Sequence, residues 1–248
     1  IPEHATLSLT GLGVCLPVIT AVMAFANLFG MGGAPLCSIE RGRGNQKEAE
    51  AIMGNAFTLM VICGILLTIL GIVFRRPLLY LFGASDSTYP YAESYMTIYL
   101  LGSVFVMMGL GMNAFINSQG FGRIGMQTVL LGAVANIILD PVFIFGFRMD
   151  VRGAALATII SQFLSAAWVL RFLFSDRSIL RLKRETMMLK KARVLKIVSM
   201  GMSSFAGGFT NSVVAVACNA TLQTWGGDLY VGVMTVIHSV REIAENLV

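Results

Sequence analysis

The sequence predicts an all-α fold, a polytopic transmembrane helix bundle. Of its 248 residues, 56% are apolar and only 12% are charged, about half the charged share of an average soluble domain. The apolar residues gather in stretches near or above the roughly 20 residues that a helix needs to cross a bilayer. Strands of a membrane barrel would instead be about 10 residues long with alternating polarity. We therefore expect an integral membrane protein built from helices.

Seven apolar stretches are expected to cross the membrane. The link between the first two, which reads FGMGGAPLCSIERGRGNQKEAE, is expected to hold a turn, with its glycines allowing close helix approach. A long polar link separates the fifth stretch from the sixth. The expected spans run approximately over residues 9–29, 52–74, 96–115, 126–147, 154–174, 194–222 and 231–248.

Basic residues predict the orientation of these spans. Thirteen of the eighteen Lys and Arg residues fall in alternate links, nine of them between residues 171 and 196. By the positive-inside rule that side is cytoplasmic, in a multi-pass protein of the plasma (inner) membrane. The net charge of +5 then reflects topology and contact with anionic lipid headgroups, and it needs no nucleic-acid partner.

The long basic link also predicts the domain organisation. We expect an amino-terminal bundle over residues 1–175, a cytoplasmic linker over 176–192 and the start of a carboxy-terminal bundle over 193–248. The chain does not begin with Met, and its last span ends without a flanking charge. These features favour a fragment of a longer protein, and we expect only the full-length protein to be active.

The strongest candidate for a functional residue is Asp140, the only charge between residues 126 and 147. An ionised Asp inside a hydrocarbon span costs roughly 2.5 to 3.5 kcal/mol, so its presence suggests a use such as binding a cation or a proton. Asn136 precedes it by one helical turn and shares its face. Thr158 is expected about five residues into the next helix, at a similar depth. Pro141 cannot donate to the carbonyl of Ile137, which leaves an acceptor free where the helix bends.

These groups together offer only oxygen ligands. A carboxylate, an amide oxygen and a hydroxyl suit Na⁺, or else an Asp that takes up a proton. Other roles stay open, because Asn136 and Thr158 could be interhelical packing groups. Asp140 could be a helix-end carboxylate bonded to neighbouring N–H groups. The sequence has neither a nucleophile–base pair nor a zinc motif, so an enzyme is disfavoured.

A second polar cluster, HSVREIAEN, lies in the last expected span. His238 with Glu242, and Arg241 with Glu245, are i,i+4 pairs that partly neutralise one another. The cluster is either a structural ion-pair network or part of a cavity. In the second case Glu242 or Glu245 attracts a cationic substrate, and Arg241 sets the charge state.

Residues 117–162, NSQGFGRIGMQTVLLGAVANIILDPVFIFGFRMDVRGAALATIISQ, resemble the fourth-to-sixth helix region of the multidrug and toxic compound extrusion (MATE) transporters, and the link after the first span resembles the family's turn between helices two and three. The resemblance implies a MATE-like bundle with about seven of twelve transmembrane helices, numbers 2 to 8. It places Asn136, Asp140 and Thr158 at the cation-binding positions of the amino-terminal bundle. The Asp that the family carries on helix one is absent from this chain. Some members also use a carboxylate on helix seven, but residues 198–222 contain no Asp or Glu.

The resemblance implies a secondary active antiporter. Such a protein exports organic cations or other small xenobiotics in exchange for Na⁺ or H⁺ by alternating access, with no cofactor besides the coupling ion. Its partners would be a small-molecule substrate and membrane lipids, and the full-length protein would be a monomer. The alternative is a flippase for a lipid-linked saccharide or precursor, which would need Arg and Lys in its cavity, where only Arg241 is available.

Overall fold

The computed structural model describes the backbone of residues 2–246 and the side chains of residues 7–238. Within that part of the chain the regular structure is entirely helical, which confirms the expected all-α class. Two short segments of other helix types are present, a π-helix at Val142–Gly146 and a 3-10 helix at Arg184–Met187. The α-helices are α1 (Pro2–Gly42), α2 (Gln46–Val73), α3 (Arg75–Leu81), α4 (Tyr89–Leu101), α5 (Ser103–Ser118), α6 (Gly122–Pro141), α7 (Asp150–Leu173) and α8 (Lys191–Asn246).

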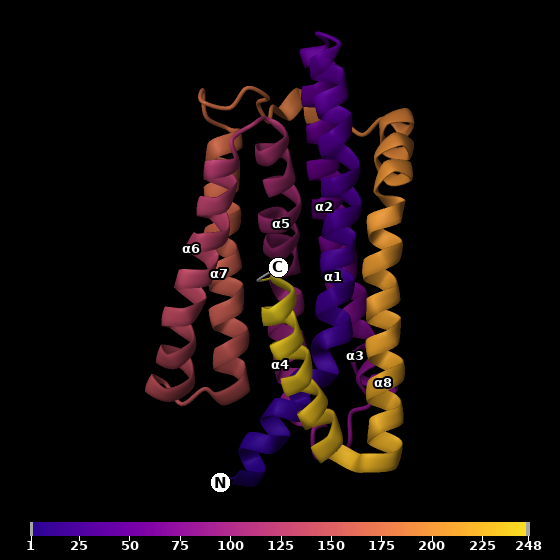
Figure 1. The fold of residues 1–248 in the computed structure, drawn as a ribbon, viewed down its shortest axis with the longest axis vertical. Helices are drawn as coiled ribbons and strands as arrows, with labels where there is room; N and C mark the ends of the chain where they lie inside the picture. Colours follow the sequence, from indigo (N-terminus) through magenta and orange to yellow (C-terminus); the bar gives the residue numbers. More distant parts are fainter. Residues whose placement is uncertain (1, 247–248) are drawn as a thin grey trace.

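Five helical segments of the described chain are long and apolar enough to cross a membrane: those of α1, α2, α6 with its π-helix, α7 and α8. The expected span over 96–115 is not straight, because α4 and α5 meet at Gly102 with a bend of 54°; the bent pair together is long and apolar enough for a sixth span. The expected break between the last two spans falls at Gly227, where non-helical backbone interrupts α8. Figure 1 shows that the second arm of α8 folds back there.

The first helix is longer than the sequence predicts. A turn was expected in the link after residue 29, but α1 continues to Gly42. The glycines of this stretch serve close packing instead, because a side chain on Gly30 would collide with Gly111 of α5 and one on Gly32 with Ile197 and Gly201 of α8. Small residues that let helix backbones approach are typical of packing in membranes.

The helices form one elongated bundle. In Figure 1, α6 and α7 stand together at one edge, α5 comes next, α1 and α2 lie in the middle, and the first arm of α8 packs along α1 at the other edge. The turn after α1, the turn after α5 and the α7–α8 connection all lie at one end, which we call the linker end. At the opposite end Asp228 accepts hydrogen bonds from Ser85 and Gln223 (3.0 Å each) beside the reversal in α8.

The connection between α7 and α8 is held against the bundle rather than hanging free. Asn55 of α2 donates to the carbonyls of Thr186 (3.1 Å) and Met188 (2.9 Å) and accepts from the Lys190 amide (2.9 Å). The buried Glu50 pairs with Lys183 at 2.7 Å. These contacts fix the linker to the first turns of α2.

Candidate functional site

Small and polar residues on one face of α6 join it to α7. Thr128, Gly132, Asn136 and Asp140 follow one another at intervals of four and therefore share that face. Ser165 of α7 donates to the carbonyl of Thr128 at 3.2 Å. A side chain on Gly132 would collide with the Ser165 hydroxyl as it is oriented here, so glycine leaves that hydroxyl free to make this bond.

A cavity of about 310 Å³ lies between these helices, α5 and α1. Its walls combine apolar side chains, such as Met23 and Leu110, with hydroxyl and amide groups that point inward from three helices. The residues lining it include neither Lys nor Arg. Its polar members are Asn113 from α5, Thr128 and Asn136 from α6, and Thr158, Ser161, Gln162 and Ser165 from α7.

Several polar atoms of this region lack a hydrogen-bond partner. Among the described side chains, five have a buried nitrogen or oxygen without one, and four of these belong here: Asn113 Oδ1, Asn136 Nδ2, Asp140 Oδ1 and Ser161 Oγ. A buried polar atom without a partner costs roughly 1 to 3 kcal/mol, and such atoms are rare in folded proteins. Their concentration at one place indicates a region built to receive a polar ligand.

The structure brings the three predicted site residues into one region. Asn136 and Thr158 line the cavity, and Asp140 lies one turn beyond Asn136 on the same face. The hydroxyl of Tyr95, on α4, lies within interaction range of Thr158 and of Asp140. Thr158 is eight residues into α7 rather than five, because α7 begins at Asp150 instead of near residue 153.

Local structure at Asp140 follows from the proline beside it. The α-helical hydrogen bonding of α6 ends at Pro141, and the chain continues as the π-helix Val142–Gly146. Proline has no N–H to donate, so the regular helix cannot continue unchanged past it. Single π-turns inside helices occur frequently at functional sites. The hydroxyl of Thr158 already donates to the Ala154 carbonyl at 2.9 Å, so its oxygen is left to act as an acceptor.

Sequence reasoning missed Asn113, Ser161 and Tyr95. A periodic signal was available on α7, where Thr158, Ser161 and Ser165 recur at the spacing of one helix face. Asn113 is one of two asparagines in the otherwise largely apolar α5, and its role becomes visible only when α5 is packed against α6, where its amide donates to the Gly125 carbonyl at 3.3 Å.

The second predicted cluster cannot be placed in the same way. Arg241, Glu242 and Glu245 lie outside the residues whose side chains are described, which end at His238. Within the described part of the chain, no three His, Cys, Asp or Glu side chains come together as a metal site would require.

A second, larger cavity of about 650 Å³ differs in chemistry. It lies between α1, α2, α3, α4 and the first arm of α8. Its lining is almost wholly apolar, with Phe25, Phe74 and Phe209 among its side chains and Ser212 as its polar member. Such a cavity suits an apolar group and offers nothing to hold an ion.

A polar cavity with unpartnered groups inside a bundle of membrane-spanning helices is typical of secondary transporters. A sequence profile of the MatE family matches residues 4–142, and the chain belongs to that family. It is 27% identical over 218 residues to the multidrug export protein MepA of Staphylococcus haemolyticus and 25% identical to MepA of Staphylococcus saprophyticus. Each alignment covers 88% of this chain and 48% of the relative.

Solved structures agree with this assignment. The MATE multidrug transporter DinF-BH is 32% identical, with a TM-score of 0.85, over 94% of this chain and 52% of that one. An inward-facing multidrug resistance MATE transporter has a TM-score of 0.88 over 93% and 52% of the two chains; at 24% identity it shows the fold alone. The chain thus spans about half the length of the relatives it matches, and those relatives are transporters rather than enzymes.

Proposed function

We propose that the protein containing this chain is a secondary active multidrug efflux antiporter, which exports organic cations or other small xenobiotics in exchange for Na⁺ or H⁺. The observation that carries the proposal is the group of unpartnered buried oxygens, Asn113 Oδ1, Asp140 Oδ1 and Ser161 Oγ, beside one polar cavity. A transporter binds and releases its ion, so its site must keep such polar groups available. The relatives named as multidrug export proteins support the substrate class.

In this proposal Asp140 supplies the charge that holds the coupling ion. Asn136 and Thr158 supply neutral oxygens, and Tyr95 orients Thr158 from the neighbouring helix. Oxygen ligands of this kind suit Na⁺, and the carboxylate alone suits H⁺. Occupation changes the charge beside Pro141 and the π-helix, which favours one bend of α6 over another. That bend biases the bundle toward releasing substrate outward.

The same proposal assigns topology. The linker end is cytoplasmic, since the segment 176–192 and the ends of the helices beside it carry most of the basic residues. Residues 1–175 belong to the amino-terminal bundle and residues 193–248 begin the carboxy-terminal bundle of a monomeric plasma-membrane protein. Arg241, Glu242 and Glu245 belong to the substrate cavity between the bundles.

A flippase for a lipid-linked saccharide is the less favoured function. Its substrate carries a pyrophosphate, which basic side chains would hold. The residues that line the polar cavity include no Lys or Arg.

Efflux of a fluorescent organic cation from cells making the complete gene product tests the proposal, with imposed Na⁺ or pH gradients. We expect gradient-driven efflux from the parent protein and its loss in Asp140→Asn, and the gradient that matters identifies the ion. Asp176→Asn is the matched control, because Asp176 has a side chain 91% exposed at the linker end. Absence of efflux from the parent protein, made at normal levels, would contradict the function. Equal efflux by Asp140→Asn and the parent would contradict the assigned site.

A further inference from the structure

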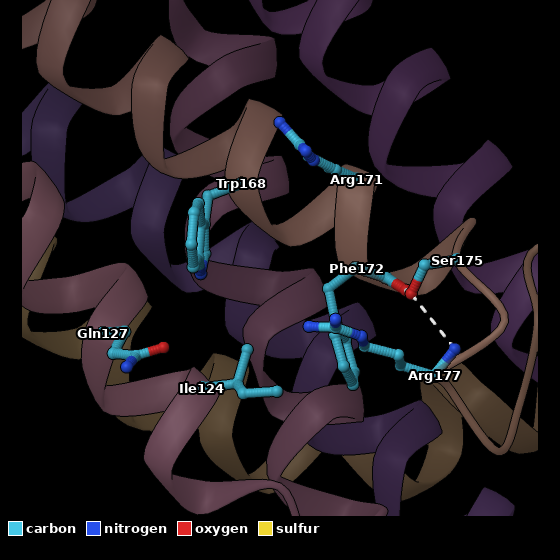
Figure 2. A pocket seen from close by; sticks show the side chains of 7 residues that line it. All are labelled: Ile124, Gln127, Trp168, Arg171, Phe172, Ser175 and Arg177. Atoms are coloured by element: carbon cyan, nitrogen blue, oxygen red, sulfur yellow. Dashed lines mark hydrogen bonds between the residues drawn. The ribbon is translucent and has the colours of Figure 1, made fainter.

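A third hollow, outside the proposed ion site and the apolar cavity, lies at the linker end of α6 and α7. Its volume is about 380 Å³, and Trp168, Arg171 and Phe172 of α7 form one wall. Ile124 and Gln127 of α6 face them, and Ser175 and Arg177 close the pocket from the loop that follows α7. In Figure 2 the Arg177 side chain runs back from that loop toward the centre of the pocket. Both arginines therefore line one small pocket, and in Figure 2 their guanidinium groups lie apart, Arg171 extending from α7 in a different direction from Arg177.

These two arginines have no acidic partner among the described residues. The ion pairs formed there use Arg43, Arg75, Arg181, Lys183 and Arg193. The nearest acid in the sequence, Asp176, is engaged by Arg181 at 2.7 Å. Arg171 and Arg177 thus keep their guanidinium donors free of an acidic partner, and the planar guanidinium matches the oxygens of a phosphate group.

The pocket continues as an apolar groove. Gln127 and Trp168 also line an adjoining hollow of about 340 Å³, whose other walls are Leu130, Leu131 and Val134. Leu130 and Val134 are each 53% exposed. From Ile124 to Val134 the groove extends about 15 Å along α6, at roughly 1.5 Å per residue. We call the two hollows together the α6–α7 groove. It has a basic end at the linker and an apolar body running into the span.

The groove lies on the outer side of α6. Gln127, Leu131 and Val134 share one face, while Thr128, Gly132 and Asn136 face the polar cavity. The ion site and the groove are therefore separated by the helix itself. A ligand in the groove meets the surroundings of the bundle and not its interior.

We propose that the α6–α7 groove binds an anionic phospholipid. Its phosphate lies between Arg171 and Arg177, and one acyl chain lies along Leu130 and Val134. Trp168 marks the boundary, where an amphipathic ring suits the junction of headgroup and hydrocarbon. A water-soluble phosphate compound would use the basic end and leave the apolar body uncovered. Basic pockets between membrane helices are known to hold anionic headgroups.

Quenching of Trp168 tests the proposal. The complete gene product is placed in phosphatidylcholine bilayers containing a small fraction of phosphatidylglycerol with brominated acyl chains, and the Trp168 signal is taken as the difference between the parent and W168F. We expect brominated phosphatidylglycerol to quench this signal at a lower fraction than brominated phosphatidylcholine does. The preference is the ratio of the phosphatidylcholine fraction to the phosphatidylglycerol fraction that gives the same quenching. This ratio should fall roughly fivefold for each arginine removed in R171Q/R177Q.

Matched controls separate the groove from general charge. R184Q/K191Q removes the same charge from exposed residues at the same end and should keep the preference. Quenching by brominated phosphatidylcholine should persist in R171Q/R177Q, which would show that Trp168 still contacts lipid. If the double variant does not fold, R171Q and R177Q are measured separately. Equal quenching of the parent by both lipids would overturn the proposal, as would an equal loss in both double variants. Relief of quenching by soluble glycerol phosphate would assign the basic end to a free anion instead.

Discussion

At the scale of single residues, the polar cavity combines side chains that are poorly satisfied in the protein. Asn136 illustrates this, because its amide nitrogen is buried without a partner on a helix that otherwise faces outward. Each such atom reduces the free energy of unfolding by roughly 1 to 3 kcal/mol. Groups retained at a cost to stability are typical of functional sites. An experiment can therefore distinguish a functional role from a packing role. Removing a packing residue should lower the stability of the protein, whereas removing an unpartnered functional residue should not.

Asn136→Ala should therefore weaken ion binding without weakening the fold. The melting temperature should stay the same or rise, because an unpartnered amide is removed. The ion concentration for half-maximal transport should rise about tenfold, as expected when a ligand to a charged group is lost. Thermal unfolding and an ion titration of the same purified variant measure the two effects. Asn45→Ala, which changes an exposed asparagine at the linker end, is the control and should leave transport unchanged. A fall in melting temperature with unchanged ion dependence in Asn136→Ala would make Asn136 a packing residue.

At the scale of elements, α1 is the helix around which the others pack. Glycines place its backbone directly against α5 and α8. Ser212 and Asn219 of α8 donate to the carbonyls of Pro17 (2.8 Å) and Gly13 (3.0 Å), so the contact continues toward the opposite end. This pairing depends on the absence of side chains at the crossing and not on hydrophobicity, since lipid chains are as apolar as the helices.

Gly201→Ala should destabilise this crossing. A methyl group at this position would collide with the Leu28 carbonyl, and backbone cannot move aside as a flexible side chain can. Overpacking of this kind costs about 1 to 3 kcal/mol, so we expect a lower melting temperature in detergent. Gly207→Ala on the same helix is the matched control, because open space surrounds that position. Equal stability of the two variants would show that α1 and α8 do not cross as closely as described.

The docking of the α7–α8 linker against α2 depends on Asn55. Asn55→Ala leaves two carbonyls and one amide of residues 186–190 without partners, and each weakens the attachment by about 1 kcal/mol. We expect trypsin to cleave the Lys- and Arg-rich linker on the order of a hundred times faster in this variant. Asn45→Ala, which loses one exposed hydrogen bond to Glu40, should be cleaved at the parent rate. Identical digestion of Asn55→Ala and the parent would contradict the docked linker.

At the scale of the whole molecule, the sequence predicts the spans better than their shape. Apolar length locates the spans because the bilayer sets it, but it carries no information on the bend at Gly102 within a uniformly apolar segment. Asn136, Asp140 and Thr158 could be predicted as site candidates because polar side chains inside an apolar span are costly and therefore uncommon. Asn113 and Tyr95 could not be predicted, since their roles depend on how α5 and α4 pack against α6 and α7. Hydropathy alone does not determine that packing.

In the whole molecule, the polar cavity is proposed to be the coupling site of an antiporter, and substrate transport by the purified protein in liposomes tests this most directly. Two modes are compared in the complete gene product and its Asp140→Asn variant: uptake driven by an imposed ion gradient, and exchange of labelled for unlabelled substrate without a gradient. We expect the variant to lose gradient-driven uptake while it keeps substrate exchange, because the carboxylate holds the ion and not the substrate. Gradient-driven uptake that survives in Asp140→Asn at the parent rate would contradict this role, and would place coupling elsewhere in the protein.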